Sequence, residues 1–319
     1  MKNKINFYNK FNYLFNKLNL TFISMEKWNI LKIKGKDRFK YIQKKVTCDL
    51  LFLKKNNFLY GSYCNEKGKV ISFFYIFYHK KEIFILVETS IIKILITEFK
   101  KYSIFSKVYF EKNYKYLLFG IAGLNSKKII KKIFNIKIKK KNILFKHNKS
   151  IIMYFNGVFK RFIIITNYET YFNILNYFKK KYKFNNSNQW LLLDIESRYP
   201  IINLNNIGKF FPQVINIDKL KGISFKKGCY LGQEIISSFQ YTKNFNKYLF
   251  YFKCVLLNTP FAGDFIEIEI KKHWYKIGII LSYCVIVNNI TVIQTVIKKN
   301  INFLKIYKIK NNYFKFINF

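Results

Sequence analysis

Arginine is almost absent from a sequence that is otherwise strongly basic. The 319 residues include 58 lysines and arginines against 16 acidic residues, for a net charge of +42, and only Arg38, Arg161 and Arg198 are arginine. Arginine is the usual reader of phosphates and base edges, so a dedicated nucleic-acid surface should contain more of it. We therefore interpret most of the lysine excess as a solvated surface of the kind toward which an AT-rich genome drifts, with a weak electrostatic contact to RNA as its consequence.

Cysteine patterns typical of disulfide-rich or zinc-binding proteins are also missing. The five cysteines are an odd number and widely spaced, and they include no C-x-x-C pair and have no histidine close by in the sequence. We therefore predict no metal site and a reducing compartment. The expected location is the cytoplasm of a bacterium, with the matrix of an organelle as the alternative.

Apolar runs long enough to cross a membrane are absent from the sequence. The longest, near Ile277 to Val287, is shorter than the roughly 20 residues that a spanning helix needs. Residues 1–25 contain no acid, as in a transit peptide, but they also lack arginine, so we interpret them as a lead-in to the first strand. We expect a monomer that makes no membrane contact.

Half of the residues are hydrophobic, which is enough to build two or three cores in a chain of this length. The segment WNILKIKG from Trp28 alternates between apolar and polar residues and predicts a strand, followed by a helix with Asp37 as its N-cap. YGSYCNEKGKVISFFYIFY predicts two strands around a turn at Glu66 to Gly68. Residues 116–186 predict a small α+β unit that ends at the turn signal NNSN, and evenly spaced strands from Tyr248 onward predict a closing β-barrel.

The segment GISFKKGCYLGQE, residues 222–234, differs in composition from the chain around it. Lys226 and Lys227 precede Cys229, and we predict that QEIISSF begins a helix after it, two features that would stabilise a thiolate. The alternative is a buried cysteine that fills a gap in the core. The spacing alone leaves both interpretations open.

Trp28 and Trp190 each open a segment that we predict to be a strand, WNILKIKG and WLLLDIE. Large aromatic residues at strand starts usually belong to the core. The alternative is a stacking wall for a flat heteroaromatic ligand.

The stretch GKFFPQVINIDKLKGISFKKGCYLGQE resembles the signature of the bacterial folate-binding, tRNA-modifying YgfZ family, whose members are relatives of the glycine-cleavage aminomethyltransferase (T-protein). Other segments resemble the family in the same order along the chain, namely WNILKIKGKDRFKYIQKKVTCDL, YCNEKGKV, KKYSIFSKV and NNSNQWLLLDIESRYPII. The resemblance runs from about Trp28 to Lys247, and its K-G-C-Y-x-G-Q-E core is highly specific.

The resemblance implies an α+β fold of the aminomethyltransferase type. Its expected units are a folate-binding domain made of residues 1–115 and 187–245, an inserted ferredoxin-like unit of residues 116–186, and a C-terminal β-barrel of residues 246–319. The implied cofactor is folate, as a tetrahydrofolate derivative.

Four site residues follow from the resemblance. Trp28 and Trp190 match the two tryptophans that line the folate site in the family, and Glu196 matches a carboxylate that faces the pterin edge in the wider superfamily. Cys229 matches the motif cysteine, which makes it the candidate catalytic or otherwise functional thiol.

The chain departs from the family pattern at three places. Arg198 stands where the family commonly has a glycine, and Ser238 stands where it has an arginine after the motif. The paired aspartates of the T-protein have no counterpart near YCNEKGKV, which argues against transfer of an aminomethyl group from a protein carrier.

The resemblance therefore predicts a folate-dependent accessory protein in tRNA modification by thiolation. It would support iron–sulfur tRNA-modifying enzymes indirectly, through a reduced folate and Cys229. The alternative is a folate-dependent one-carbon transferase of the aminomethyltransferase type, and the absence of a clear general base beside the motif argues against it.

Overall fold

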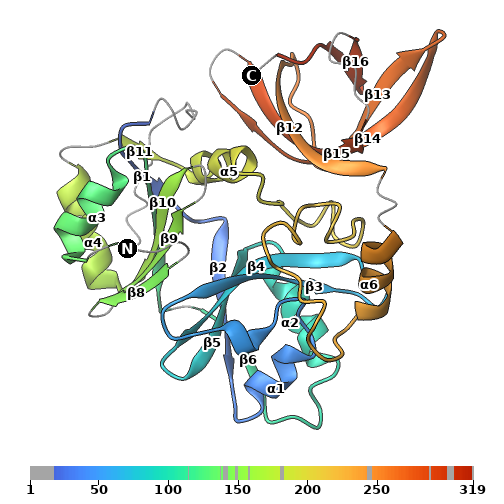
Figure 1. The fold of residues 1–319 in the computed structure, drawn as a ribbon. Coiled ribbons are helices and arrows are strands. Elements are labelled where there is room, and N and C mark those ends of the chain that lie inside the picture. The colour runs from blue at the N-terminus through green and yellow to red at the C-terminus, as the bar shows by residue number, and fades with distance from the viewer. Residues whose placement is uncertain are drawn as a thin grey trace.

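A computed structural model describes residues 18–317 apart from residues 114, 137, 139–142, 148–149, 157–158, 180–182, 243–245, 287–288 and 300–304. The described residues form three β-sheets, and helices cover one face of two of them (Figure 1). The architecture is the α+β fold that the sequence predicts.

The first sheet is antiparallel, and helices cover one of its faces. Its strand order is β3–β4–β5–β2–β6, with β2 (Trp28–Lys34), β3 (Phe58–Cys64), β4 (Val70–His79), β5 (Glu82–Glu88) and β6 (Tyr109–Lys112). On the helix side lie α1 (Arg38–Gln43), the short 3-10 helix η2 (Leu50–Phe52) and α2 (Ile92–Lys100). Strand β4 is apolar almost throughout because both faces are buried: Phe74 and Ile76 pack on the helix side, and Phe73 and Tyr75 pack on the opposite side.

The second sheet contains the strands of the predicted unit 116–186 and one further strand from the start of the chain. Its order is β11–β1–β7–β10–β9–β8, with β1 (Thr21–Ser24), β7 (Leu117–Ala122), β8 (Ile143–His147), β9 (Ser150–Asn156), β10 (Lys160–Thr166) and β11 (Lys183–Asn185). Helices α3 (Ser126–Phe134) and α4 (Tyr168–Lys179) cover one face. Strand β1, which the sequence analysis did not predict, pairs with β7 on one side and with β11 on the other.

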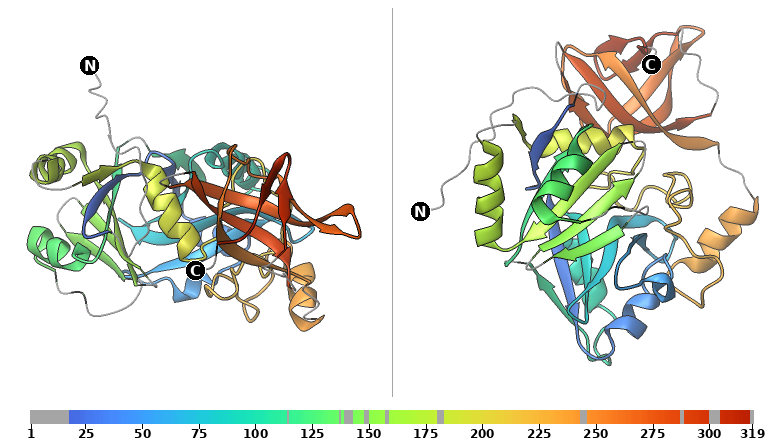
Figure 2. Two further views of the ribbon diagram at one scale, coloured as in Figure 1. Left: turned by 90° about the horizontal axis from the view of Figure 1, so that it is seen from above. Right: turned by 60° about the vertical axis from the view of Figure 1, so that its left-hand side comes forward.

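The uncovered faces of the two sheets pack against each other. Their shared core contains Phe58, Tyr60 and Tyr75 from the first sheet and Phe155 and Ile163 from the second. The first two sheets and their helices therefore form four layers, which Figure 2 shows from two further directions.

The C-terminal strands form the small barrel that the sequence predicts. Its sheet order is β12–β15–β14–β13–β16–β17, with β12 (Lys247–Val255), β13 (Phe265–Ile270), β14 (His273–Val285), β15 (Ile290–Lys298), β16 (Tyr307–Ile309) and β17 (Asn312–Phe314). An antiparallel bridge between Ile317 and Lys253 on β12, with Ile317 N donating to Lys253 O at 2.8 Å, joins the two edges of the sheet. The sheet is thus curled so that its two edges approach each other at this one bridge.

The prediction of a strand at WLLLDIE is wrong, because these residues belong to helix α5 (Ser187–Glu196). Asn186, part of the predicted turn signal, caps the helix by accepting a hydrogen bond from Asn188 N at 3.0 Å. An apolar run of this length is compatible with a buried strand or a buried helix, and periodicity does not distinguish them. The N-cap formed by Asn186 is the local feature that favours a helix over a strand here.

Helix α5 ends in a Schellman motif whose left-handed residue is Arg198. Tyr199 N donates to Asp194 O at 3.0 Å, Arg198 N donates to Ile195 O at 2.9 Å, and Arg198 has a φ of +60°. Glycine is favoured at this position because it has no Cβ, and glycine is also what the resemblance described above implies there. Arg198 therefore adopts a backbone conformation that glycine would adopt at lower cost.

Replacing Arg198 with glycine should raise the free energy of unfolding by about 1 kcal/mol, because a side chain in the left-handed region costs about that much. Ser197→Gly is the matched control: its φ is −81°, so the same change should destabilise the protein. Denaturant unfolding of both variants measures the difference. Destabilisation by both changes would contradict the interpretation of Arg198 as a strained cap.

Candidate functional site

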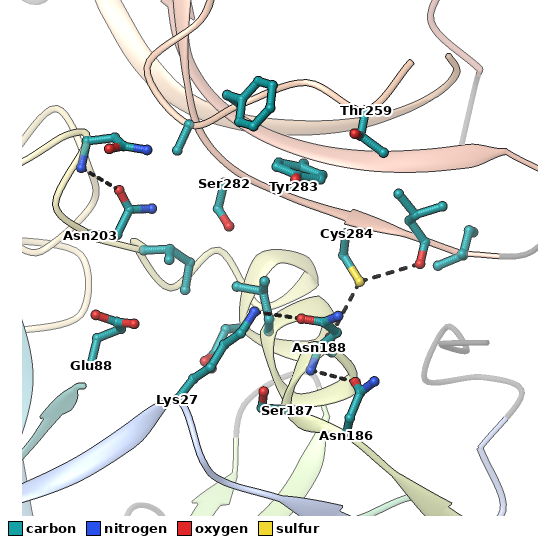
Figure 3. Close-up of a pocket in the computed structure, with 18 of the residues that line it drawn as sticks. Lys27, Glu88, Asn186, Ser187, Asn188, Asn203, Thr259, Ser282, Tyr283 and Cys284 are labelled. Carbon is teal, nitrogen blue, oxygen red and sulfur yellow. Dashed lines mark hydrogen bonds between the residues drawn. The ribbon is translucent and has the colours of Figure 1, made fainter. Parts of the chain in front are cut away.

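A cavity with a volume of about 800 Å³ lies where the first sheet, α5 and the barrel meet (Figure 3). Its wall is formed by the β1–β2 connection, the first turns of α5, the loop after α5 and the barrel strand β14. A volume of this size suits a small-molecule ligand. We refer to it as the main cavity.

Polar groups on the wall of the main cavity are held in place by hydrogen bonds. Lys27 Nζ donates to Asn188 Oδ1 at 2.7 Å, and Cys284 Sγ lies 3.4 Å from Asn188 O (Figure 3). Glu88 accepts hydrogen bonds from the backbone and the hydroxyl of Ser90. The cavity therefore presents an ammonium group, amide groups and a carboxylate in fixed positions.

Asp194 also lines the main cavity, but its carboxylate is covered and belongs to a buried ion pair. Asp194 Oδ1 lies 2.7 Å from Nη2 of Arg161, and the two side chains are 1% and 0% exposed. Arg161 comes from β10 in the second sheet, so the pair links that sheet to α5. Burial raises the pKa of the Asp194 carboxyl to about 6, and the Arg161 guanidinium opposes this shift. At pH 7 the pair is therefore ionised.

Aromatic rings surround the guanidinium of Arg161. Its central carbon lies 4.5 Å from the ring centroid of Trp190, 5.2 Å from that of Tyr199 and 5.7 Å from that of Phe155. Contacts of a desolvated cation with ring faces are favourable, most of all with tryptophan. These rings compensate for part of the hydration that the buried cation has lost.

Trp190 lies in the core behind this ion pair. The ring is fully buried, and a Cβ built on Gly120 of β7 would lie 2.7 Å from its Cε3 atom. Trp190 is not among the described residues that line the main cavity. The Trp190 ring packs against the guanidinium of Arg161 and so helps to hold the Arg161–Asp194 pair in place.

Trp28, in contrast, lines the main cavity and is partly buried. It is the first residue of β2, it pairs with Glu88 on β5, and its ring centroid lies 5.6 Å from that of Tyr75. Tyr75 in turn contacts Phe155, which contacts Trp190. The two predicted tryptophans thus belong to one aromatic core, and Trp28 is the one that reaches the cavity.

The other two predicted site residues, Glu196 and Cys229, are not among the described residues that line the main cavity. Glu196 is the last residue of α5, and two residues along a helix lie on roughly opposite faces, so it points away from the side on which Asp194 lies. Cys229 is exposed, so it is not the buried gap-filler that the alternative interpretation expects.

The motif loop, residues 222–232, is attached to the first sheet and its helices through Lys227. The buried Nζ of Lys227 donates to three backbone carbonyls, those of Gln43 and Val46 at 2.6 Å and of Cys48 at 2.8 Å. Burial lowers the pKa of Lys227 to about 8. Its ammonium is therefore engaged with these carbonyls, and the exposed Lys226 is the lysine left beside Cys229 in the sequence.

The C-terminal side of the motif loop packs on the β3–β4 turn. Gly232 has a φ of +79°, and a Cβ there would lie 2.6 Å from Asn65 O. Gln233 begins α6 (Gln233–Thr242), which confirms the predicted helix, and its side chain accepts a hydrogen bond from Tyr230 N at 3.2 Å. These contacts hold Cys229 on a fixed loop just before a helix.

Cys229 is the accessible thiol among the five cysteines. Cys48, Cys64, Cys254 and Cys284 are all buried, and burial raises the pKa of each to about 12. A thiol reacts as its thiolate, so the buried cysteines are inert near neutral pH.

The sequence analysis missed Asp194 and Arg161, although each carries a signal. Asp194 lies two residues before Glu196 in the same segment, and Arg161 is one of three arginines and stands at the start of the apolar strand RFIIIT. Over the part of the chain that the structure describes, no group of three His, Cys, Asp or Glu residues is placed to hold a metal ion. None of the described helices has the length and apolar character needed to cross a membrane.

Comparison with curated proteins identifies close relatives over most of the chain. A tRNA-modifying protein YgfZ of Buchnera aphidicola subsp. Schizaphis graminum is 38% identical over 294 residues, covering 92% of this chain and 92% of the relative. The tRNA-modifying protein YgfZ of Blochmanniella pennsylvanica is 35% identical over 293 residues, covering 89% of this chain and 88% of the relative. No protein-family model matches the sequence.

Among solved structures, the glycine cleavage system aminomethyltransferase T of Bartonella henselae has a similar fold. It superposes with a TM-score of 0.70 at 9% identity, covering 94% of this chain and 86% of that protein. At this identity the likeness shows the fold alone, whereas the curated relatives show the family. The chain therefore belongs to the YgfZ family.

Proposed function

We propose that the protein binds a reduced folate in the main cavity and acts in tRNA modification as an accessory factor. The observation that carries the proposal is the lining of this cavity, to which Trp28, Lys27 and Asp194 belong, with the buried Asp194–Arg161 ion pair directly beneath it. These groups match the parts of a folate: a flat pterin, an N–H donor edge and a carboxylate tail. The names of the curated relatives support the link to tRNA modification.

In this proposal Asp194 takes the role for which the sequence predicts Glu196. A carboxylate that accepts two parallel N–H bonds is a strong, orienting contact for an aminopyrimidinone. Arg161 would favour the ionised form of the Asp194 carboxylate and hold it in place through the ion pair. Trp28 would provide the aromatic wall, with Trp190 as support for the ion pair.

The state of the acidic residues that line the main cavity favours an accessory role over a transferase. Of the described residues that line the main cavity, only Glu88 and Asp194 carry a carboxylate, and both are already engaged, by Ser90 and by Arg161. Neither is a free general base. The exposed thiol on the motif loop would then act on a partner, for which we propose the iron–sulfur enzymes of tRNA thiolation.

Folate binding should weaken as the pH falls through about 6. The Asp194 carboxyl has its pKa raised to about 6, so it is ionised above this pH and protonated below it. A protonated carboxyl offers fewer acceptors to the ligand's N–H groups. Calorimetric titration with 5-formyltetrahydrofolate at several pH values measures the effect, and an affinity unchanged between pH 7 and pH 5 would exclude Asp194 as the acceptor.

Complementation tests the accessory function. Thiolated tRNA would be measured in a bacterial strain that lacks its own YgfZ protein and carries either the wild-type chain or Cys229→Ala. We expect the wild type to restore thiolation and Cys229→Ala to fail, while Cys254→Ala, which removes a buried thiol of the barrel, should restore it. Equal rescue by Cys229→Ala would show that the thiol has no functional role.

A further inference from the structure

A second cavity, of about 310 Å³, lies on another part of the molecule. It is formed where the start of β4, the loop after α5, α6 and the first residues of the barrel meet. Its lining residues do not overlap with those of the main cavity. The folate proposal therefore leaves it without a role.

Aromatic rings and lysines are combined in this second cavity. The rings of Phe211 and Phe239 lie 4.1 Å apart between centroids, at an interplanar angle of 35°. The ammonium of Lys69 lies 3.3 Å from the centroid of Phe211. Lys209 and Lys247 also line the cavity, and none of its described lining residues is acidic.

Hydrogen bonds hold the walls of the cavity in position. Phe210 O accepts from Val70 N at 2.9 Å, which ties the loop after α5 to β4. The buried side chain of Gln213 donates to Ile236 O on α6 at 2.6 Å, and Leu249 N on β12 donates to Val214 O at 3.0 Å. A cavity whose walls are fixed in this way loses little entropy when a ligand binds.

The charge of the cavity points to an anionic ligand. Lys69 is partly buried, and burial lowers its pKa, so its ammonium lacks part of its hydration and gains from an anion placed beside it. Aromatic faces bind flat bases by stacking, whatever the identity of the base. A flat base that carries a phosphate satisfies both features.

We propose that this second cavity binds one nucleotide of a single-stranded RNA. The ammonium of Lys69 leaves the face of Phe211 to contact an adjoining phosphate, together with Lys209 and Lys247, and the base takes its place against the Phe211–Phe239 pair. The volume of about 310 Å³ limits the cavity to one base, and its three lysines are the groups available to the adjoining phosphates. The site would hold RNA independently of folate.

The test must separate a site from a generally basic surface. A fluorescein-labelled oligouridylate and an abasic ribose-phosphate chain of the same length carry the same charge and differ only in their bases. With the wild-type protein, fluorescence anisotropy should show roughly tenfold tighter binding of the oligouridylate, as expected for about 1.4 kcal/mol of stacking. This comparison needs no variant, so folding defects cannot affect it.

Variants then locate the contact. Phe211→Leu keeps an apolar side chain and should reduce the affinity for the oligouridylate to that of the abasic chain. Lys69→Gln should lower the slope of log affinity against log salt by about 0.7, whereas Lys128→Gln, an equal charge change at an exposed position of α3, should leave it unchanged. Equal binding of the two probes, or equal effects of the two lysine changes, would overturn the proposal.

Discussion

Asp194→Asn should lower the free energy of unfolding by about 3–5 kcal/mol, the typical effect of breaking a buried ion pair from one side. Arg161 is fully buried, and its carboxylate partner lies 2.7 Å away, so the substitution leaves a guanidinium among aromatic rings without a counter-charge. The loss of a charge, rather than of volume, causes the effect, because asparagine has almost the same shape as aspartate. Chemical denaturation monitored by circular dichroism measures it.

Two controls identify the mechanism. Glu88→Gln removes the other carboxylate of the main cavity, which is only partly buried and has no described ion-pair partner, so its effect should stay below about 1 kcal/mol. The double variant Arg161→Met with Asp194→Leu removes both charges and should be more stable than Asp194→Asn alone. A double variant that is less stable than the single one would show that the pair itself stabilises the fold.

Lys227→Met should destabilise the protein by about 3 kcal/mol. The methionine side chain has a similar length but donates no hydrogen bonds, so the carbonyls of Gln43, Val46 and Cys48 lose their donor in a buried position. Each bond to a charged donor contributes about 1.5–3 kcal/mol, and the cost of burying the ammonium offsets part of the sum. Denaturant unfolding measures the change.

Lys226→Met is the matched control for this prediction. It makes the same substitution one residue earlier in the motif, at an exposed side chain, and should change the free energy of unfolding by less than about 0.5 kcal/mol. If the two variants have the same stability, Lys227 does not attach the motif loop to the first sheet and its helices.

Local patterns predicted most of the elements of the fold. The alternation in WNILKIKG predicted β2, the polar turn at Glu66 to Gly68 predicted the β3–β4 hairpin, and the even spacing after Tyr248 predicted the barrel. These features depend on residues that are close in sequence. Strand β1 was not predicted because it is short and because it pairs with β7 and β11, which are distant in the sequence.

The helix α5 shows where local patterns fail. Its sequence, SNQWLLLDIE, is buried on nearly every side, between the second sheet and the barrel, so the apolar period that distinguishes a helix from a strand is lost. Glu196 was assigned from the family resemblance, whereas Asp194, two residues earlier on the same helix, is the acidic residue of α5 that lines the main cavity. Which residue of a helix faces a cavity depends on its rotation, and packing against distant elements sets that rotation.

The motif residues illustrate a second limit. The spacing K-K-G-C-Y suggested two lysines acting on one thiol, and the sequence contains no sign that one of them binds carbonyls about 180 residues earlier in the chain. The exposure of Cys229 could likewise not be derived from the residues beside it. Both properties follow from how the motif loop packs on the first sheet and its helices.

A titration of the protein with 5-formyltetrahydrofolate, followed by tryptophan fluorescence, tests the central claim most directly. The chain has three tryptophans: Trp28 on the cavity wall, Trp190 behind it and Trp274 in the barrel. We predict saturable quenching that Trp28→Phe largely removes and that Trp274→Phe leaves intact. Absence of saturable quenching, or quenching that survives in Trp28→Phe and disappears in Trp274→Phe, would contradict folate binding in the main cavity.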